Sequence, residues 1–173
     1  SDYLHTFKLD RKVGLFCFIP SLSFVKFTIF AKIAVLGRHE LYFMDTGLAC
    51  YLTRWNNYEA LEDGAYAGAI FETYVISEIL KSYWHNGKEP FVYFYRDKDK
   101  YEIDLLIEQN NTLYPIEIKK TASPTSDDAK NFFITNRIKN VQIGQCCVIC
   151  NCSQVLNIKN KDISALAIPV EFI

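Results

Sequence analysis

Two neighbouring segments of the chain place charged residues where an apolar strand needs core side chains. They are residues 100–108 and 114–119, and apolar residues fill most of their other positions. Side chains alternate between the two faces of a strand, so a charge inside such a run faces a packed interior. Asp104, Glu117 and Lys119 are the charges in question, and their burial is costly unless they have partners.

A hairpin between these segments brings two of the charges face to face. Pairing Glu108 with Leu113 and counting back places Asp104 opposite Glu117, with Lys119 on the same face. Directly opposed carboxylates, with Cβ atoms about 5 Å apart, repel unless a positive charge lies between them. A divalent metal ion is the simplest such charge. A register shift of one residue would place an apolar side chain opposite Asp104 and remove the site.

The composition indicates one globular domain with a small appendage. The 173 residues are enough for a real core, and 50% are hydrophobic while 23% are charged. We expect residues 1–39 to form an N-terminal segment of uncertain fold and residues 40–173 to form the main domain. Residues 13–37 are long and apolar enough to raise the question of a membrane span, but Pro20, Lys26 and Lys32 interrupt them. We therefore expect buried strands there and no membrane association.

A helix is predicted over residues 65–84. Apolar residues recur at steps of three and four on one stripe, which consists of Ala69, Ile76, Ile79, Leu80 and Tyr83. Glu72 lies inside that stripe, so it points toward the core or its margin. An ion pair with Arg96 or Lys119 would satisfy it, as would a metal ion.

The remaining elements give an α/β pattern. Strands are expected over residues 91–96, 100–108 and 112–120, a helix from the 123–128 start cluster to about 139, and a strand at 145–152. Two edge strands are expected at 155–158 and 168–173. The second helix would cross over to a strand parallel to the third. The sequence therefore predicts a central mixed sheet flanked by helices.

Four of the six cysteines lie in residues 145–152, which has the pattern of a buried strand. Neighbouring cysteines on one strand make poor intrachain disulfides, so we expect free thiols in a reducing cytoplasm. Cys147 and Cys150 form a lone C-x-x-C, and a cysteine-ligated metal domain is a weaker alternative because no second pair follows.

Placed together, these elements allow Glu72, Asp104, Glu117 and Lys119 to converge on one point. Carboxylates suit Mg²⁺ or Mn²⁺, so Asp104, Glu117 and Glu72 are the candidate metal ligands. A lysine beside them can hold a water molecule or stabilise charge on a phosphoryl oxygen. The four residues are thus a candidate catalytic site for phosphodiester hydrolysis.

Asp104 followed by Glu117-Ile118-Lys119, after a helix that bears Glu72, resembles the PD-(D/E)xK nuclease superfamily. That resemblance implies a restriction-endonuclease-like αβββαβ core and a Mg-dependent deoxyribonuclease. It assigns metal binding to Asp104 and Glu117, catalysis to Lys119 and the helical acid to Glu72. The Pro-Asp dipeptide of the motif is replaced here by Ile103-Asp104.

A combination of motifs resembles more closely the uncharacterised domain found C-terminal to prokaryotic AAA-type ATPase modules. The motifs are residues 41–48, residues 68–72, Arg96 and residues 102–104. The resemblance implies an ATPase module and a winged-helix-like linker segment ahead of this domain. Whether residues 1–39 are a remnant of that linker is left open. No Walker-type motif occurs, so we expect the ATPase to lie outside this chain.

Nucleic acid, with DNA as the expected form, is the predicted partner. The net charge of −1 gives no global basic field, so contacts must be local, and Arg96, Lys120 and Lys130 are the candidates. An ordinary solvated helix face explains the lysines after residue 118 equally well. The alternative function is a catalytically inactive module that binds nucleic acid or protein and regulates the companion ATPase. Homo-oligomerisation is left open.

Overall fold

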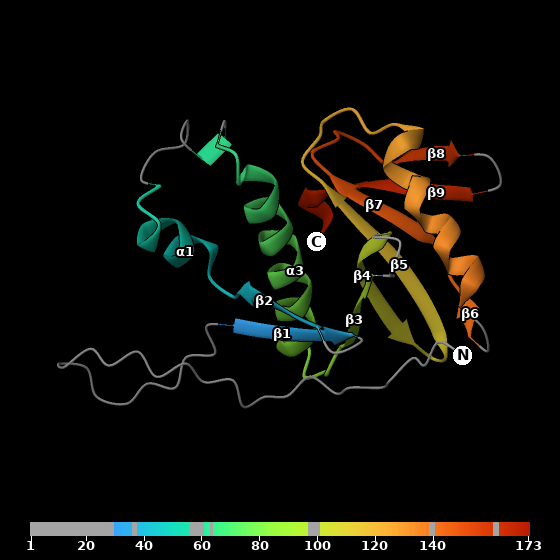
Figure 1. Ribbon diagram of the computed structural model, residues 1–173, viewed down its shortest axis with the longest axis horizontal. Helices are drawn as coiled ribbons and strands as arrows, with labels where there is room; N and C mark the ends of the chain where they lie inside the picture. The colour runs from blue at the N-terminus through green and yellow to red at the C-terminus, as the bar shows by residue number, and fades with distance from the viewer. Residues whose placement is uncertain are drawn as a thin grey trace.

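Figure 1 shows the computed structural model, which describes residues 30–35, 38–55, 61–62, 64–96, 101–138, 141–160 and 163–173. The N-terminal elements are β1 (Phe30–Val35), β2 (Arg38–Phe43), α1 (Thr46–Leu52) and α3 (Ala67–His85). The next are β3 (Phe91–Arg96), β4 (Glu102–Gln109), β5 (Thr112–Lys119) and the 3₁₀ helix η1 (Ser126–Arg137). The last are β6 (Gln142–Ile143), β7 (Cys146–Cys150), β8 (Leu156–Asn160), β9 (Ile163–Pro169) and the 3₁₀ turn η2 (Val170–Phe172).

A mixed sheet of seven strands forms the centre of the molecule, in the order β3-β4-β5-β7-β9-β8, with β6 beside β5. The first three strands are antiparallel, and β7 and β9 continue the sheet parallel to β5. Helix α3 packs on one face and η1 on the other, as Figure 1 shows. The predicted α/β fold, with the element order αβββαβ from α3 to β7, is confirmed.

The β4–β5 hairpin has the register that the sequence predicts. Glu108 pairs with Leu113, and the paired positions continue to Leu105 opposite Ile116. The two turn residues, Asn110 and Asn111, both have positive φ (53° and 59°), as a type I′ turn requires. Asparagine tolerates this left-handed conformation, and the turn twists the strands in the hand that a sheet prefers. The turn thereby fixes which side chains of β4 and β5 face each other.

One expectation about the C-terminal half is wrong, and the expected helix there is of a different type. The strand expected at residues 168–173 begins earlier, and this strand, β9, lies inside the sheet between β7 and β8, so of the two expected edge strands β8 alone lies at an edge. The segment after residue 125 forms a 3₁₀ helix. Its buried residues Ala129, Phe132 and Thr135 recur every three positions, which matches the three residues per turn of that helix.

Strand β2 and helix α1 join the main domain from the N-terminal side. The Asp45 side chain accepts a hydrogen bond from the Leu48 backbone N–H at 2.9 Å and so caps α1. Strand β2 contacts α3. The domain boundary expected between residues 39 and 40 falls within β2 and remains a prediction. The expected strands at residues 13–29 lie outside the described residues. In the described parts of the chain, no helix is both long enough and apolar enough to cross a membrane.

Two glycines provide a matched test of this packing. A Cβ atom on Gly144 would lie 2.5 Å from the Tyr114 ring, whereas one on Gly68 in α3 would meet nothing within 4 Å. We predict that Gly144→Ala lowers the free energy of unfolding by about 1–3 kcal/mol. Gly68→Ala should raise it by up to about 1 kcal/mol because alanine favours the helix. Urea denaturation measures both, and equal effects would contradict the placement of β6 and its following turn.

Candidate active site

The hairpin brings three of the predicted site residues into direct contact. Asp104 lies near the start of β4, and Glu117 and Lys119 lie at the end of β5. Lys119 Nζ is 2.7 Å from Glu117 Oε2 and 3.3 Å from Asp104 Oδ2. One ammonium group therefore bridges two carboxyl groups that come from adjacent strands.

A β-bulge in β4 sets the position of Asp104. Tyr93 pairs with Leu106 but Tyr95 pairs with Ile103, so two residues of β4, Asp104 and Leu105, lie opposite one residue of β3. The extra residue bends the strand and redirects its side chains, which is a common feature beside functional sites. Where the paired positions of β4 and β5 end, the Asp104 carboxylate accepts a hydrogen bond from the Ile118 backbone N–H at 2.8 Å. Asp104 is therefore anchored by the main chain as well as by Lys119.

Glu117 is the most unusual residue of the site, because its side chain is only 1% exposed. Lys119 Nζ is close to Oε2, but no described donor makes a well-directed hydrogen bond to either carboxylate oxygen. Burial, reinforced by the negative charge of Asp104, raises the pKa of Glu117 to about 8, although Lys119 opposes the shift. Burial works to lower the pKa of Lys119, but the two carboxylates outweigh it and raise that pKa. With both acids ionised, the site would carry more negative charge than one lysine neutralises, and the raised pKa of Glu117 reflects burial together with that excess.

The donor set fits a hard divalent cation. Mg²⁺ prefers oxygen ligands and is usually held by one or two carboxylates, with water and substrate phosphates completing its coordination. Asp104 and Glu117 supply two such groups, and the buried oxygens of Glu117 lack the hydrogen bonds that a purely structural carboxylate normally has. Asp104 and Glu117 are thus the residues that could hold Mg²⁺ or Mn²⁺.

Glu72, the third predicted ligand, contacts strand β2. In the described part of the chain, no three His, Cys, Asp or Glu side chains are close enough together to hold a metal ion. The Tyr42 hydroxyl, 4% exposed on β2, donates a hydrogen bond to Glu72 Oε1 at 3.0 Å. The convergence of Glu72 with Asp104 and Glu117 stays a prediction; helix α3 packs on β2, which brings Tyr42 to the acid. Tyr42 belongs to the 41–48 motif, which was the available signal for this contact.

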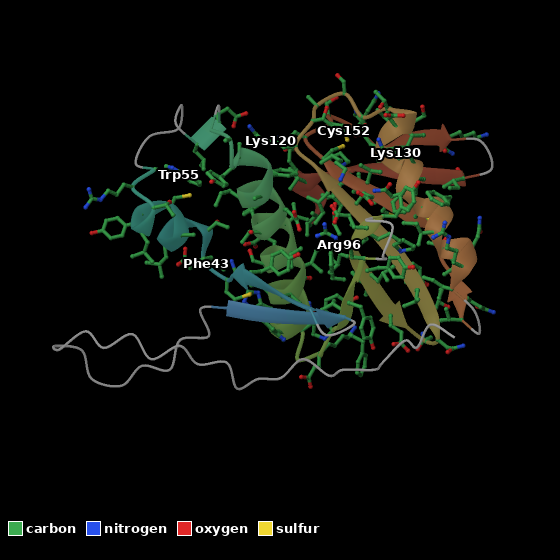
Figure 2. All side chains as sticks on the ribbon, in the orientation of Figure 1. Phe43, Trp55, Arg96, Lys120, Lys130 and Cys152 are labelled. Carbon is green, nitrogen blue, oxygen red and sulfur yellow. The ribbon has the colours of Figure 1, made fainter. Side chains whose placement is uncertain are left out.

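The three basic residues expected to contact nucleic acid each lie beside an acid. Arg96 Nε is 3.6 Å from Glu102, Lys130 Nζ is 3.5 Å from Asp127, and Lys120 Nζ is 2.9 Å from the Glu62 carboxylate. Lys120 also donates to the Glu62 backbone carbonyl at 2.7 Å. Figure 2 shows the three labelled side chains in different parts of the molecule. They do not form a single basic stripe in that view.

The cysteine strand has the expected free thiols and is β7. The described cysteines are free, and Cys146, Cys150 and Cys152 are buried. Burial raises the pKa of Cys146 and of Cys150 to about 11, so both thiols remain protonated. A protonated thiol is a poor nucleophile. The cysteine-ligated metal domain stays an untested alternative, and the described residues contain no group of three His, Cys, Asp or Glu side chains that could hold a metal ion.

Comparison with protein families gives one match. The family model described as "Domain of unknown function (DUF4143)" matches residues 67–172, which covers α3, the entire seven-stranded sheet and η1. No curated protein and no solved structure matches the chain.

The raised pKa of Glu117 predicts a specific pH dependence of stability. Between about pH 4.5 and pH 8 the folded protein holds a proton on Glu117 that the unfolded chain has lost, so stability falls as pH rises through this window. Glu117→Gln stays neutral. In metal-free buffer, the wild type should therefore lose stability relative to this variant, at most by about 1.4 kcal/mol per pH unit.

Thermal unfolding of both proteins at pH 5 and pH 8.5 measures the effect. Glu171→Gln, at an exposed position near the C-terminus, is the control and should follow the wild type. A constant difference between wild type and Glu117→Gln at the two pH values would mean that Glu117 titrates normally.

Proposed function

We propose that this chain, which belongs to the DUF4143 family, is a nuclease-like domain that binds nucleic acid and hydrolyses phosphodiester bonds with a divalent metal ion. Its proposed relatives are the PD-(D/E)xK nucleases, and DNA is the proposed substrate. The observation that carries the proposal is the Asp104–Glu117–Lys119 cluster, in which a carboxylate 1% exposed has no well-directed hydrogen bond from any described donor. The αβββαβ element order supports the same assignment.

Each residue of the cluster has a distinct role in this proposal. Asp104, held in place by the Ile118 N–H, and Glu117, from the next strand, would hold the metal ion. When bound, Mg²⁺ or Mn²⁺ polarises a phosphoryl oxygen and lowers the pKa of a water molecule. Lys119 stays protonated, so it can orient the attacking water and stabilise negative charge on the phosphoryl group. Glu72, whose carboxylate accepts a hydrogen bond from Tyr42, is the helical acid of the proposed site.

The cellular setting is part of the proposal. The free thiols support a reducing compartment such as the cytoplasm of a prokaryote. The companion would be a AAA-type ATPase module on another part of a longer protein. ATP hydrolysis there would control access of the nucleic acid to this domain.

A second candidate function is a non-catalytic module that binds a protein partner. Large apolar side chains are exposed at α1 and at the start of α3: Tyr51 is 73% exposed, Leu52 61% and Tyr66 63%. The Tyr66 ring stacks on Trp55 with 5.5 Å between ring centroids. Exposed apolar groups at one end of a domain are typical of a protein contact, and the companion ATPase module is the proposed partner.

Cleavage assays test the nuclease proposal. We predict Mg²⁺-dependent cleavage of DNA by the wild type and a loss of at least about 100-fold in Lys119→Ala, the size expected when one stabilising donor is removed. Asp104→Asn should weaken metal binding as well as cleavage. Lys159→Ala, on the exposed edge strand β8, is the matched control and should cleave normally. Circular dichroism confirms that each variant is folded.

The same variants separate the two candidate functions. A binding module would bind nucleic acid or the ATPase module with nearly unchanged affinity in Lys119→Ala and Asp104→Asn, and neither protein would cleave DNA. Cleavage that persists at the wild-type rate in both variants would contradict the assignment of the active site.

A further inference from the structure

Lys119 is the member of the cluster that meets solvent. The side chain of Glu117 is 1% exposed and that of Asp104 11%, whereas that of Lys119 is 36% exposed. The ammonium group contacts both carboxylates, at 2.7 Å and 3.3 Å. Lys119 therefore lies between the two acids and the outside, in the place where an incoming cation would meet them.

Charge balance determines which cation can replace the Lys119 ammonium group beside Asp104 and Glu117. When both carboxylates are ionised they carry two negative charges, and Lys119 neutralises one of them. A divalent cation neutralises both, and a cation added beside Lys119 would meet its repulsion at short range. Asp104 keeps its hydrogen bond to the Ile118 N–H if Lys119 moves away. Glu117 keeps no well-directed hydrogen bond from a described residue, so a buried charge would be left without compensation unless a cation entered.

We propose that Lys119 is the resident counter-ion of the Asp104–Glu117 pair. A divalent cation enters only when the Lys119 side chain turns away from the two acids and its ammonium group binds a phosphate of the nucleic acid. This inference rests on the proposed function and concerns the regulation of the same site. The metal ion and the phosphodiester chain then bind with positive coupling. A bound phosphate draws Lys119 away from the acids, which frees them for the metal ion, and a bound metal ion frees Lys119 for the phosphate. The site stays closed to metal ions until a polyanion arrives.

The chemistry of lysine suits this exchange. Its ammonium group sits on a flexible chain of four carbons and can rotate outward without any movement of β5. A phosphate oxygen accepts a strong charge-assisted hydrogen bond from it. The phosphate that takes Lys119 also lies within reach of the cation that replaces it, and phosphates commonly complete the coordination of Mg²⁺.

Two binding measurements test the coupling without any cleavage step. Fluorescence anisotropy gives the affinity for a hydrolysis-resistant phosphorothioate duplex, with a chelator and with saturating Mn²⁺ at constant ionic strength. We predict that Mn²⁺ tightens DNA binding by about 5- to 150-fold in the wild type, the usual range of coupling between sites. In Lys119→Met the tightening should fall to the part that direct coordination of the metal ion by a phosphate supplies. Calorimetry without DNA should show that this variant binds Mn²⁺ more tightly than the wild type does.

Two further variants make the test decisive. Lys88→Met, in the exposed turn after α3, removes a lysine elsewhere and should retain the wild-type coupling. Lys119→Arg keeps the charge and holds carboxylates with a rigid fork of donors, so it should weaken Mn²⁺ binding even if the methionine variant fails to fold.

The outcomes separate this inference from the proposed function. Equal tightening by Mn²⁺ in the wild type and in Lys119→Met would overturn the exchange while leaving the metal site intact. Mn²⁺ binding to the arginine variant that equals wild-type binding would overturn it as well. No detectable Mn²⁺ binding by the wild type, with or without DNA, would overturn both the exchange and the proposed nuclease.

Discussion

The ion pair between Glu117 and Lys119 is the interaction on which this site depends. A carboxylate 1% exposed inside a sheet loses several kcal/mol of hydration, and one ammonium group 2.7 Å away recovers only part of that. An apolar residue of similar volume would fill the same space with less cost. The sheet keeps an acid there that its packing does not need, together with a second acid, Asp104, that makes the burial still less favourable.

The fold makes this arrangement possible through four strands. The Asn110–Asn111 turn fixes the register of β4 and β5, the bulge opposite β3 redirects β4 at Asp104, and β7 covers the far side of Glu117 with Val148. The helices cover the sheet: apolar side chains of α3 pack on one face and those of η1 pack on the other. Asp104 is thus held by a backbone N–H, and Lys119 is the most exposed member of the cluster.

Much of this could be predicted from the sequence because the signals are local. The hairpin register follows from two apolar strands and a short turn, and the approach of Asp104 to Glu117 follows from that register. Contacts between distant segments left little signal beyond the 41–48 motif that contains Tyr42. Nothing in residues 65–84 shows that Tyr42 would bind Glu72, and the pattern of β9 does not reveal that it lies inside the sheet. The bulge also escaped prediction, since it depends on how β3 pairs.

Anomalous X-ray scattering from crystals grown with Mn²⁺ and a hydrolysis-resistant phosphorothioate oligonucleotide would test the central claim most directly. The account predicts one strong manganese peak bound by carboxylate oxygens of both Asp104 and Glu117, with Lys119 turned toward a phosphate. Lys119 still bridging the two acids, with manganese absent from them at saturating concentration, would show that the cluster is a structural ion pair and would contradict the account.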